Sequence, residues 1–372
     1  MLGIVVTEFR NLPVGGVPRG RGAGLNPANR FDPIHLDVLG EHLDEQRIDP
    51  ASGRPVRTEV YRDATRTLIN RVDPATSAEI GFRWSINPYR GCEHGCSYCY
   101  ARPTHETFGL SCGLDFETRI FAKTGAPALL RRELGRSGWR GEKIMMSGVT
   151  DCYQPIESRL RLTRGCLEVM AECRQPVGLV TKNRLVLRDL DVLTRLAAHR
   201  AVWVALSVTT LDRGLAARME PRASCPSDRL EAVRRLADAG IPVSVMVAPV
   251  IPGLNDREIP DILAAAAAAG AKAASKVLLR LPWQVKDVFV QWLKRHHPDR
   301  AQRVIALIRE TRDGRLYDAT IGRRLRGTGT VARQIDDMFR LFARRHGLDR
   351  KPEDPSGEAF QRPERPGQMR LF

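Results

Sequence analysis

Three cysteines lie close together in a glycine-rich stretch, residues 87–102, which reads NPYRGCEHGCSYCYAR. Cys92, Cys96 and Cys99 are separated by three and then by two residues. Thiolates at close spacings of this kind hold iron–sulfur clusters. In a cubane [4Fe-4S] cluster, three protein ligands leave one iron open for a substrate or cofactor, as a catalytic zinc site keeps one open position. The spacing therefore favours a [4Fe-4S] cluster.

A zinc site is the main alternative for this loop. The same three cysteines could bind zinc together with His94 or His105. Zinc sites usually combine two paired ligand sets, and no second pair of cysteines separated by two residues occurs in the chain. We place the cluster first and keep the zinc site as the alternative.

Strand-like and helix-like segments alternate around and after this loop. Short apolar runs predict strands over residues 82–86, 144–146, 177–180, 202–208, 243–250 and 276–281. Amphipathic stretches predict helices over residues 126–134, 160–173, 188–199, 228–239, 259–269 and 285–295. Six consecutive βα units imply an α/β fold with a parallel sheet and right-handed crossovers. No glycine-rich dinucleotide turn opens the first helix, which favours a partial (β/α)6 TIM-type barrel over a Rossmann sheet.

The rest of the chain flanks this barrel, which we expect to span residues 76–296. The N-terminal extension, residues 1–75, is poorly patterned; we expect a flexible basic tail over 1–30 and a partly packed lead-in over 31–75. A basic helical segment is expected over 297–350. Residues 351–372 contain four prolines and many charges, which predicts a loose tail.

The charge of the chain indicates a polyanionic partner. The formal net charge is +16, and residues 271–350 alone carry 19 Lys and Arg against 8 Asp and Glu. An excess of this size is typical of proteins that bind nucleic acid. A well-solvated basic surface without a partner explains the same numbers. Net charge influences solubility and association but does not identify a fold.

The composition also suggests a compartment. No apolar run reaches the roughly 18 residues that a membrane span needs. The chain begins MLGIVV, which lacks the basic flank and the apolar length of a secretory signal. We expect a cytoplasmic protein without a membrane partner, in which eight cysteines serve as ligands and buried thiols rather than as disulfides.

The cysteine loop, set in a βα-repeat chain, resembles that of the radical S-adenosylmethionine (SAM) superfamily. Later segments also resemble this family: residues 145–151, 180–182, 205–210, 219–222, 229–232 and 247–256. Together they resemble the branch related to spore photoproduct lyase, whose members are often labelled DNA repair photolyases. The resemblance covers about residues 80–290. The cysteine loop is specific for the superfamily, whereas the later segments point to the branch.

The resemblance implies an enzyme with two cofactors, a [4Fe-4S] cluster and SAM. The amino and carboxylate groups of SAM would chelate the open iron. One electron, supplied by a donor such as a flavodoxin or ferredoxin, would cleave the sulfonium, and the 5′-deoxyadenosyl radical would take a hydrogen from the substrate. The cofactors carry this chemistry, while the barrel positions them and excludes water.

The resemblance also assigns SAM contacts to the residues at the strand ends. The family places contacts to the SAM amino group at the end of the second strand, where this chain has Ser147, Gly148, Thr150 and Asp151. Asp151 could equally cap the following helix.

Four further residues are expected near SAM. Lys182 follows the third strand and could pair with the SAM carboxylate, or reach solvent at the rim. Ser207 and Thr209 alternate along the fourth strand, so their side chains share one face and suit the ribose and carboxylate. Tyr98 could meet the adenine or pack within the loop.

One departure from the family concerns the hydrogen donor. In spore photoproduct lyase, a cysteine at the second strand end returns a hydrogen atom to the product radical. Alignment on Thr150 and Asp151 puts Gly148 at that position. Cys152 could replace the missing donor; the alternative is an inert, small buried residue.

These observations lead to one function and two alternatives. We expect a radical SAM enzyme that acts on nucleic acid, by repair of a lesion or modification of a base, with the basic segment binding phosphates. Radical chemistry on a peptide or small metabolite is the first alternative. A non-enzymatic, zinc-stabilised nucleic-acid-binding module is the second.

Overall fold

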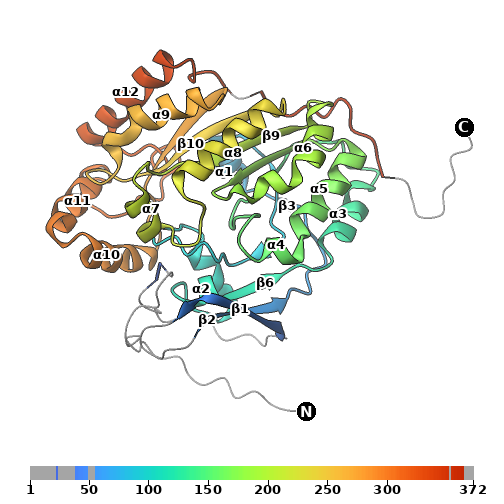
Figure 1. The fold of residues 1–372 in the computed structure, drawn as a ribbon, viewed down its shortest axis with the longest axis horizontal. Helices are drawn as coiled ribbons and strands as arrows, with labels where there is room; N and C mark the ends of the chain where they lie inside the picture. The colour runs from blue at the N-terminus through green and yellow to red at the C-terminus, as the bar shows by residue number, and fades with distance from the viewer. Residues whose placement is uncertain (1–21, 24–37, 49–54, 352, 364–372) are drawn as a thin grey trace, which may run out of the picture.

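The computed structural model of this protein describes residues 22–23, 38–48, 55–351 and 353–363 (Figure 1). The flexible tail expected over residues 1–30 therefore lies outside the described residues, apart from Gly22 and Ala23. Within the described ranges, no helix is long and apolar enough to cross a membrane.

A seven-stranded sheet forms the centre of the described part, and its strand order confirms the partial barrel. The order is β11-β10-β9-β8-β7-β4-β3, and each neighbouring pair from β4 to β11 is parallel. The parallel strands are β4 (Trp84–Ile86), β7 (Ile144–Met146), β8 (Val177–Thr181), β9 (Val202–Ser207), β10 (Val243–Val250) and β11 (Ala273–Leu278). The short strand β3 (Asn70–Arg71) joins β4 in the antiparallel direction. Consecutive parallel strands need crossovers, and the helices supply them.

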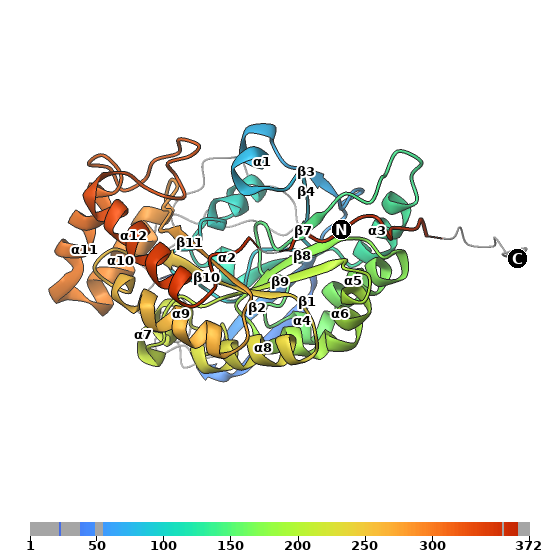
Figure 2. The same cartoon turned by 90° about the horizontal axis from the view of Figure 1, so that it is seen from above.

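Helices follow the strands and cover the outer side of the sheet, where Figure 2 shows α5, α6, α8 and α9 in a row. The longer barrel helices are α3 (Ala126–Leu134), α5 (Leu162–Cys173), α6 (Leu190–Ala197), α8 (Pro226–Asp238), α9 (Ile259–Ala268) and α10 (Val285–His296). Shorter elements are α1 (Pro74–Ile80), α2 (Asp115–Thr118), α4 (Glu157–Leu160), α7 (Arg213–Met219), and the 3-10 helices η1 (Arg102–Phe108), η2 (Arg184–Asp189) and η3 (Asp256–Glu258). The last strand begins before the predicted residue 276, because Ala273 to Ser275 pair with β10 although small residues carry little strand signal.

Two more helices, α11 (Pro298–Glu310) and α12 (Gly329–Arg345), lie in the segment expected to be helical and basic. The helix α12 packs against α9 (Figure 1). Its buried face consists of Ala332, Ile335, Phe339 and Ala343, which recur at helical spacing. The main hydrophobic core therefore extends from the barrel helices into this segment.

A second sheet, not expected from the sequence, lies beside the barrel (Figure 1). In the described part its order is β1-β2-β6-β5. The strands are β1 (Val38–Ile48), β2 (Pro55–Arg62), β5 (Tyr89–Arg90) and β6 (Arg119–Ala122). Charged residues interrupt the apolar alternation of the first two, so residues 31–75 gave only a weak strand signal. Because β5 ends two residues before Cys92, this sheet fixes the start of the cysteine loop.

The C-terminal segment is not loose where the structure describes it. The backbone N–H of Ser356 donates to the carbonyl of Arg200 at 2.8 Å, and that of Gln361 to Cys173 at 2.9 Å. Phe360 packs against the main core. The prediction of a loose tail from residue 351 was therefore wrong for residues 353–363, because Phe360 and several hydrogen bonds anchor this charged, proline-rich segment.

Candidate active site

The cysteine loop begins after β4, at the edge of the barrel where the parallel strands end. Cys92 and Cys96 are buried, and Cys99 is partly exposed. Gly91 has a φ angle of 78° and Gly95 one of 65°. A Cβ at Gly91 would also approach a neighbouring ring carbon to 2.8 Å. Glycine is thus required at both turns of the loop, for conformation and for space.

A buried arginine outside the ligand spacing holds the loop in place. Nε and Nη2 of Arg102 donate to the carbonyl oxygen of Cys96 at 3.0 and 2.7 Å, and Nη1 donates to that of Gly113 at 2.8 Å. Nη2 also pairs with the buried carboxylate of Glu117. Because both charges are buried and paired, the position of the loop is tightly specified.

Both histidines near the loop have partners away from the cysteines. Nδ1 of His94 lies 3.4 Å from Oδ2 of Asp151, and Nε2 lies 3.3 Å from Nδ2 of Asn183. Nε2 of His105 lies 2.7 Å from the carbonyl oxygen of Arg119. Burial lowers the pKa of His105 to about 4. His94 is thus engaged at both ring nitrogens, whereas Nδ1 of His105 has no hydrogen-bond partner among the described residues.

The three thiols occupy one neighbourhood, and their chemistry fits a cluster. Burial raises the pKa of Cys92, and the nearby charges of Asp151, Cys96 and Cys99 raise it further. In the described part of the chain, no three Cys, His, Asp or Glu side chains already converge as a metal site. Metal binding would require these thiols to lose their protons. A set of three neighbouring thiols suits a cluster with one open iron.

The end of β7 lies directly against the cysteine loop. Oγ1 of Thr150 donates to the carbonyl oxygen of Gly91 at 2.6 Å. The hydroxyl of Tyr100 donates to the carbonyl oxygen of Gly148, also at 2.6 Å. Ser147 adopts a φ of 79°, which is unusual for a residue with a side chain and marks a sharp turn here. The residues expected near the SAM amino group thus border the cysteine loop.

Asp151 braces two strand ends and does not cap a helix. Its carboxylate accepts from Oγ1 of Thr181 and from the N–H of Lys182, both at 2.8 Å, and from the N–H of Tyr153 at 2.9 Å. Burial raises its pKa, but His94 and these donors outweigh burial, so the pKa falls below its usual value. The carboxylate is therefore a charged link between the ends of β7 and β8.

Lys182 lies within a cluster of oxygens at the end of β8. Nζ donates to Oγ of Ser207 at 2.7 Å, and to Oγ1 of Thr209 and the carbonyl oxygen of Ala248 at 3.0 Å each. It also lies 3.1 Å from Oε1 of Glu220. Ser207 and Thr209 share one face, as predicted. Lys182 points inward to this face and does not extend into solvent at the rim.

Glu220 is the centre of this cluster, and sequence analysis gave it no role. Its carboxylate accepts from Oγ1 of Thr209 at 2.6 Å and from the hydroxyl of Tyr98, and it pairs with Arg229. Burial raises its pKa, but the charges of Arg229 and Lys182 lower it far below the usual range. Glu220 and Arg229 both lie in segments that resemble the family, and this resemblance was the only sign in the sequence that they matter. Their meeting depends on the packing of α7 and α8.

Comparison with known proteins identifies the family of this chain. The model of the Radical SAM superfamily matches residues 86–266. An uncharacterized protein of Mycobacterium tuberculosis (strain H37Rv) is 37% identical over 246 residues, which are 66% of this chain and 72% of that protein. This chain belongs to the radical SAM superfamily. It is therefore an enzyme, and the family implies SAM, a [4Fe-4S] cluster and a source of electrons.

Solved structures share the fold of this radical SAM enzyme. A cysteine-to-serine mutant of spore photoproduct lyase has a TM-score of 0.55 at 18% identity, over 77% of this chain and 79% of that chain. Another mutant, with bound AdoMet and dinucleoside spore photoproduct, has a TM-score of 0.54 at 18% identity, over 77% and 79%. At such low identity the likeness shows the fold alone.

Cys152, the candidate hydrogen donor, directly follows Asp151 and is packed in the core. Cys152 is fully buried and belongs to the main hydrophobic core. Its backbone N–H donates to Oγ of Ser147 at 2.9 Å, so it supports the turn at the end of β7. These surroundings match the alternative of a small, inert core residue, and we assign it no catalytic role.

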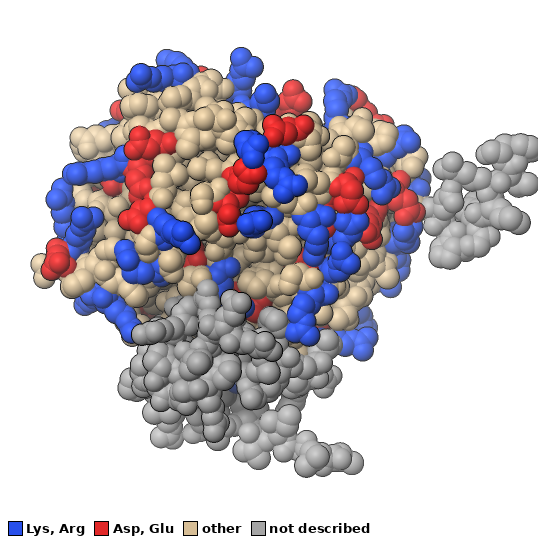
Figure 3. All heavy atoms as spheres, in the orientation of Figure 1, with Lys and Arg blue, Asp and Glu red and all other residues tan. Residues whose placement is uncertain are grey.

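Two neighbouring arginines of the basic C-terminal segment are paired with acids. Arg323 forms ion pairs with Asp313 and with Asp318, and Arg324 pairs with Glu79 at 2.5 Å. Figure 3 shows Lys and Arg interspersed with Asp and Glu across the visible face. For Arg323 and Arg324, this pairing fits the alternative of a solvated basic surface.

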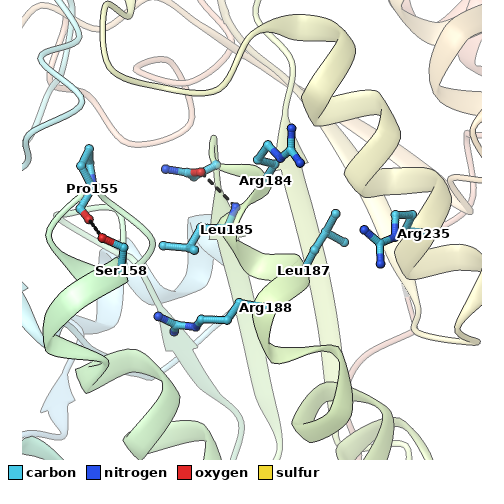
Figure 4. Close-up of a pocket in the computed structure, with 8 residues that line it drawn as sticks. Pro155, Ser158, Arg184, Leu185, Leu187, Arg188 and Arg235 are labelled. Carbon is cyan, nitrogen blue, oxygen red and sulfur yellow. Dashed lines mark hydrogen bonds between the residues drawn. The ribbon is translucent and has the colours of Figure 1, made fainter. Parts of the chain in front are cut away.

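A hollow is lined in part by residues that follow Lys182 in the sequence (Figure 4). Its volume is about 500 Å³. It is lined by Pro155, Ser158, Asn183, Arg184, Leu185, Leu187, Arg188 and Arg235, which come from the loops after β7 and β8 and from α8. The lining thus combines three arginines with the apolar side chains of Pro155, Leu185 and Leu187, and contains no carboxylate.

Proposed function

We propose that this radical SAM enzyme uses a [4Fe-4S] cluster on Cys92, Cys96 and Cys99 to cleave SAM and take a hydrogen from a nucleic acid. The observation that carries the proposal is the position of three neighbouring thiols at the carboxyl ends of the barrel strands, joined by hydrogen bonds to the end of β7. When bound, the cluster supplies the electron and the open iron for the SAM amino and carboxylate groups. A flavodoxin or ferredoxin would deliver the electron.

Lys182 would hold the SAM carboxylate. Its ammonium group has three N–H bonds but contacts four oxygens, so an incoming carboxylate can take over one of these contacts. Glu220 would stay neutralised during this exchange, because Arg229 also binds it. The residues Ser147, Gly148, Thr150 and Asp151 would surround the amino group, with Tyr98, Ser207 and Thr209 completing the site.

The hollow lined by residues that follow Lys182 supports nucleic acid as the substrate. Arg188 is neutralised by Glu157 and Asp189. Arg184 and Arg235 are exposed, and only Arg184 has an ion-pair partner among the described residues, Asp228 at 3.4 Å. These two guanidinium groups beside apolar side chains suit phosphates and the flat faces of bases. The target base would be extruded from the stack towards the mouth.

The test is an anaerobic reaction of the reduced protein with SAM and candidate substrates. A cluster enzyme is brown and contains roughly four iron and four sulfide. With a deuterated nucleic-acid substrate, we expect deuterium in the 5′-deoxyadenosine produced. A colourless zinc protein would refute the cluster. Deuterium transfer from peptides or metabolites, but not from nucleic acids, would refute the substrate.

A further inference from the structure

We propose that Gly22 and Ala23 form a cover on the cysteine loop and hold it in the conformation that binds the cluster. Two hydrogen bonds seat this dipeptide. The N–H of Gly22 donates to Oε2 of Glu117 at 3.0 Å, and the N–H of Ala23 donates to Oε1 at 2.8 Å. Each carboxylate oxygen thus receives one backbone donor, and both residues are buried.

The carboxylate of Glu117 also connects the cover to Cys96, one of the three predicted cluster ligands. Glu117 is fully buried and pairs with Arg102, which in turn holds the carbonyl oxygen of Cys96. A continuous set of polar contacts therefore runs from Gly22 to Cys96. Because Glu117 and Arg102 are both charged and buried, neither can move alone without leaving an unpaired charge in the interior.

The cover lies on the loop so closely that only glycine fits. A Cβ at Gly22 would lie 1.7 Å from the carbonyl oxygen of Gly95 and 3.0 Å from the N of Ser97. Real Cβ atoms do not approach backbone this closely, so the loop or the cover would have to shift. The contact falls on Gly95 and Ser97, the two residues that flank Cys96.

The cover adds a second contact to the loop. Thr150, at the end of β7, binds the carbonyl oxygen of Gly91, and Gly22 packs against Gly95. Solvent exposure is one of the properties that set the behaviour of a protein-bound iron–sulfur cluster. This inference rests on the proposed cluster: the cover would keep water and oxygen from the cluster and preserve the turn that spaces two of its ligands.

The test compares Gly22→Ala with Gly138→Ala. A Cβ at Gly138 meets nothing within 4 Å, so this variant is a matched control for the same chemical change. The first measurement is amide hydrogen exchange of residues 95–98 in the metal-free protein. We expect Gly22→Ala to exchange several-fold faster there than the parent, and Gly138→Ala to match the parent. Parent-like exchange in Gly22→Ala would overturn the cover.

The second measurement is the rate at which the reconstituted cluster loses its absorbance in air. We expect faster loss in Gly22→Ala and no change in Gly138→Ala. If exchange increases but the parent itself binds no cluster, the cover stands and the proposed function fails. If exchange increases but the loss of absorbance does not, the shielding role is refuted.

A second variant tests the same proposal if Gly22→Ala fails to fold. Ala23→Pro removes the N–H that donates to Oε1 of Glu117 and adds no side chain at Gly22. We expect it to raise exchange over residues 95–98 while the far-ultraviolet circular dichroism stays that of the parent. Unchanged exchange in this folded variant would equally overturn the cover.

Discussion

Lys182 and Glu220 form an ion pair that links the end of β8 to the residue after α7, with 3.1 Å between Nζ and Oε1. The Glu220 side chain is fully buried, and Arg229 provides its second cation. Because Glu220 also accepts from the hydroxyl of Tyr98, the pair ties the cysteine loop to the barrel strands. The stability of the barrel mouth should therefore depend on one carboxylate.

We expect Glu220→Gln to lower the free energy of unfolding by about 3–5 kcal/mol, because it leaves the buried Arg229 and the partly buried Lys182 without their shared anion. Denaturant unfolding measures this loss. The matched control is Glu231→Gln, whose partner Arg234 is exposed, so the loss should stay below about 1 kcal/mol. Equal losses in the two variants would contradict a special role for Glu220.

Replacing Cys92, Cys96 or Cys99 by Ala should remove most of the iron and all SAM cleavage, because each supplies one of three protein ligands. Iron analysis and the assay of 5′-deoxyadenosine report the two effects. Cys112→Ala is the control, since this thiol lies outside the ligand spacing, and its cluster spectrum should match that of the parent. Full iron content and activity in any one of the three ligand variants would refute the assignment.

Lys182→Ala should weaken SAM binding about ten- to a hundredfold, the equivalent of roughly 1.5–3 kcal/mol for one charge-assisted contact. Ser207→Ala should weaken it less, because Thr209 and Ala248 still orient the ammonium group. Equilibrium binding of SAM to the reconstituted, unreduced protein separates the two variants. Parent-like affinity in Lys182→Ala would show that the SAM carboxylate binds elsewhere.

The double variant Arg184→Ala, Arg235→Ala should flatten the salt dependence of nucleic-acid binding by up to about two units of slope, because fewer counterions are released. The matched control is Arg323→Ala, Arg324→Ala, in which both arginines already pair with acids. Its slope should match that of the parent. If the control flattens the slope and the first variant does not, the phosphates bind to the C-terminal segment instead.

His105 should make the fold sensitive to acid. Its Nε2 donates to a carbonyl oxygen, so Nδ1 carries no proton, and burial lowers the pKa to about 4. A pKa below that of the unfolded chain means that protonation favours unfolding. The stabilisation is complete above about pH 6.5 and is lost as the pH falls towards 4, by up to roughly 3 kcal/mol. Denaturant unfolding at several pH values should show a shallower acid slope for His105→Gln than for the parent. Identical slopes would contradict this account.

The sequence was sufficient to predict features whose signal lies in residues close together along the chain. The spacing of Cys92, Cys96 and Cys99 and the apolar runs of the strands are both local patterns, and they led to the family and the barrel. Glu220 and Gly22 were not found, because their roles come from contacts with residues far along the chain. Net charge counts residues but does not say which acids Arg323 and Arg324 meet, so it left the nucleic-acid surface and the solvated surface as alternatives.

The sheet β1-β2-β6-β5 was missed for a related reason. Its strands come from segments far apart in the sequence, and β5 contains only Tyr89 and Arg90. A strand of two residues has no periodicity to read. Such strands form because a neighbour offers backbone partners, and here β6 does so.

The hydrogen bonds of residues 353–363 indicate how much of the chain folds as one cooperative unit. Arg362 donates to the carbonyl oxygen of Ser137, Gln361 binds that of Cys173 and Ser356 that of Arg200. Ser137, Cys173 and Arg200 precede β7, β8 and β9, so this segment joins the amino ends of neighbouring strands. The family match ends at residue 266, well before these contacts. The stretch that the family model matches is therefore smaller than the cooperative folding unit, and a fragment cut to residues 86–266 should not unfold in a single sharp transition.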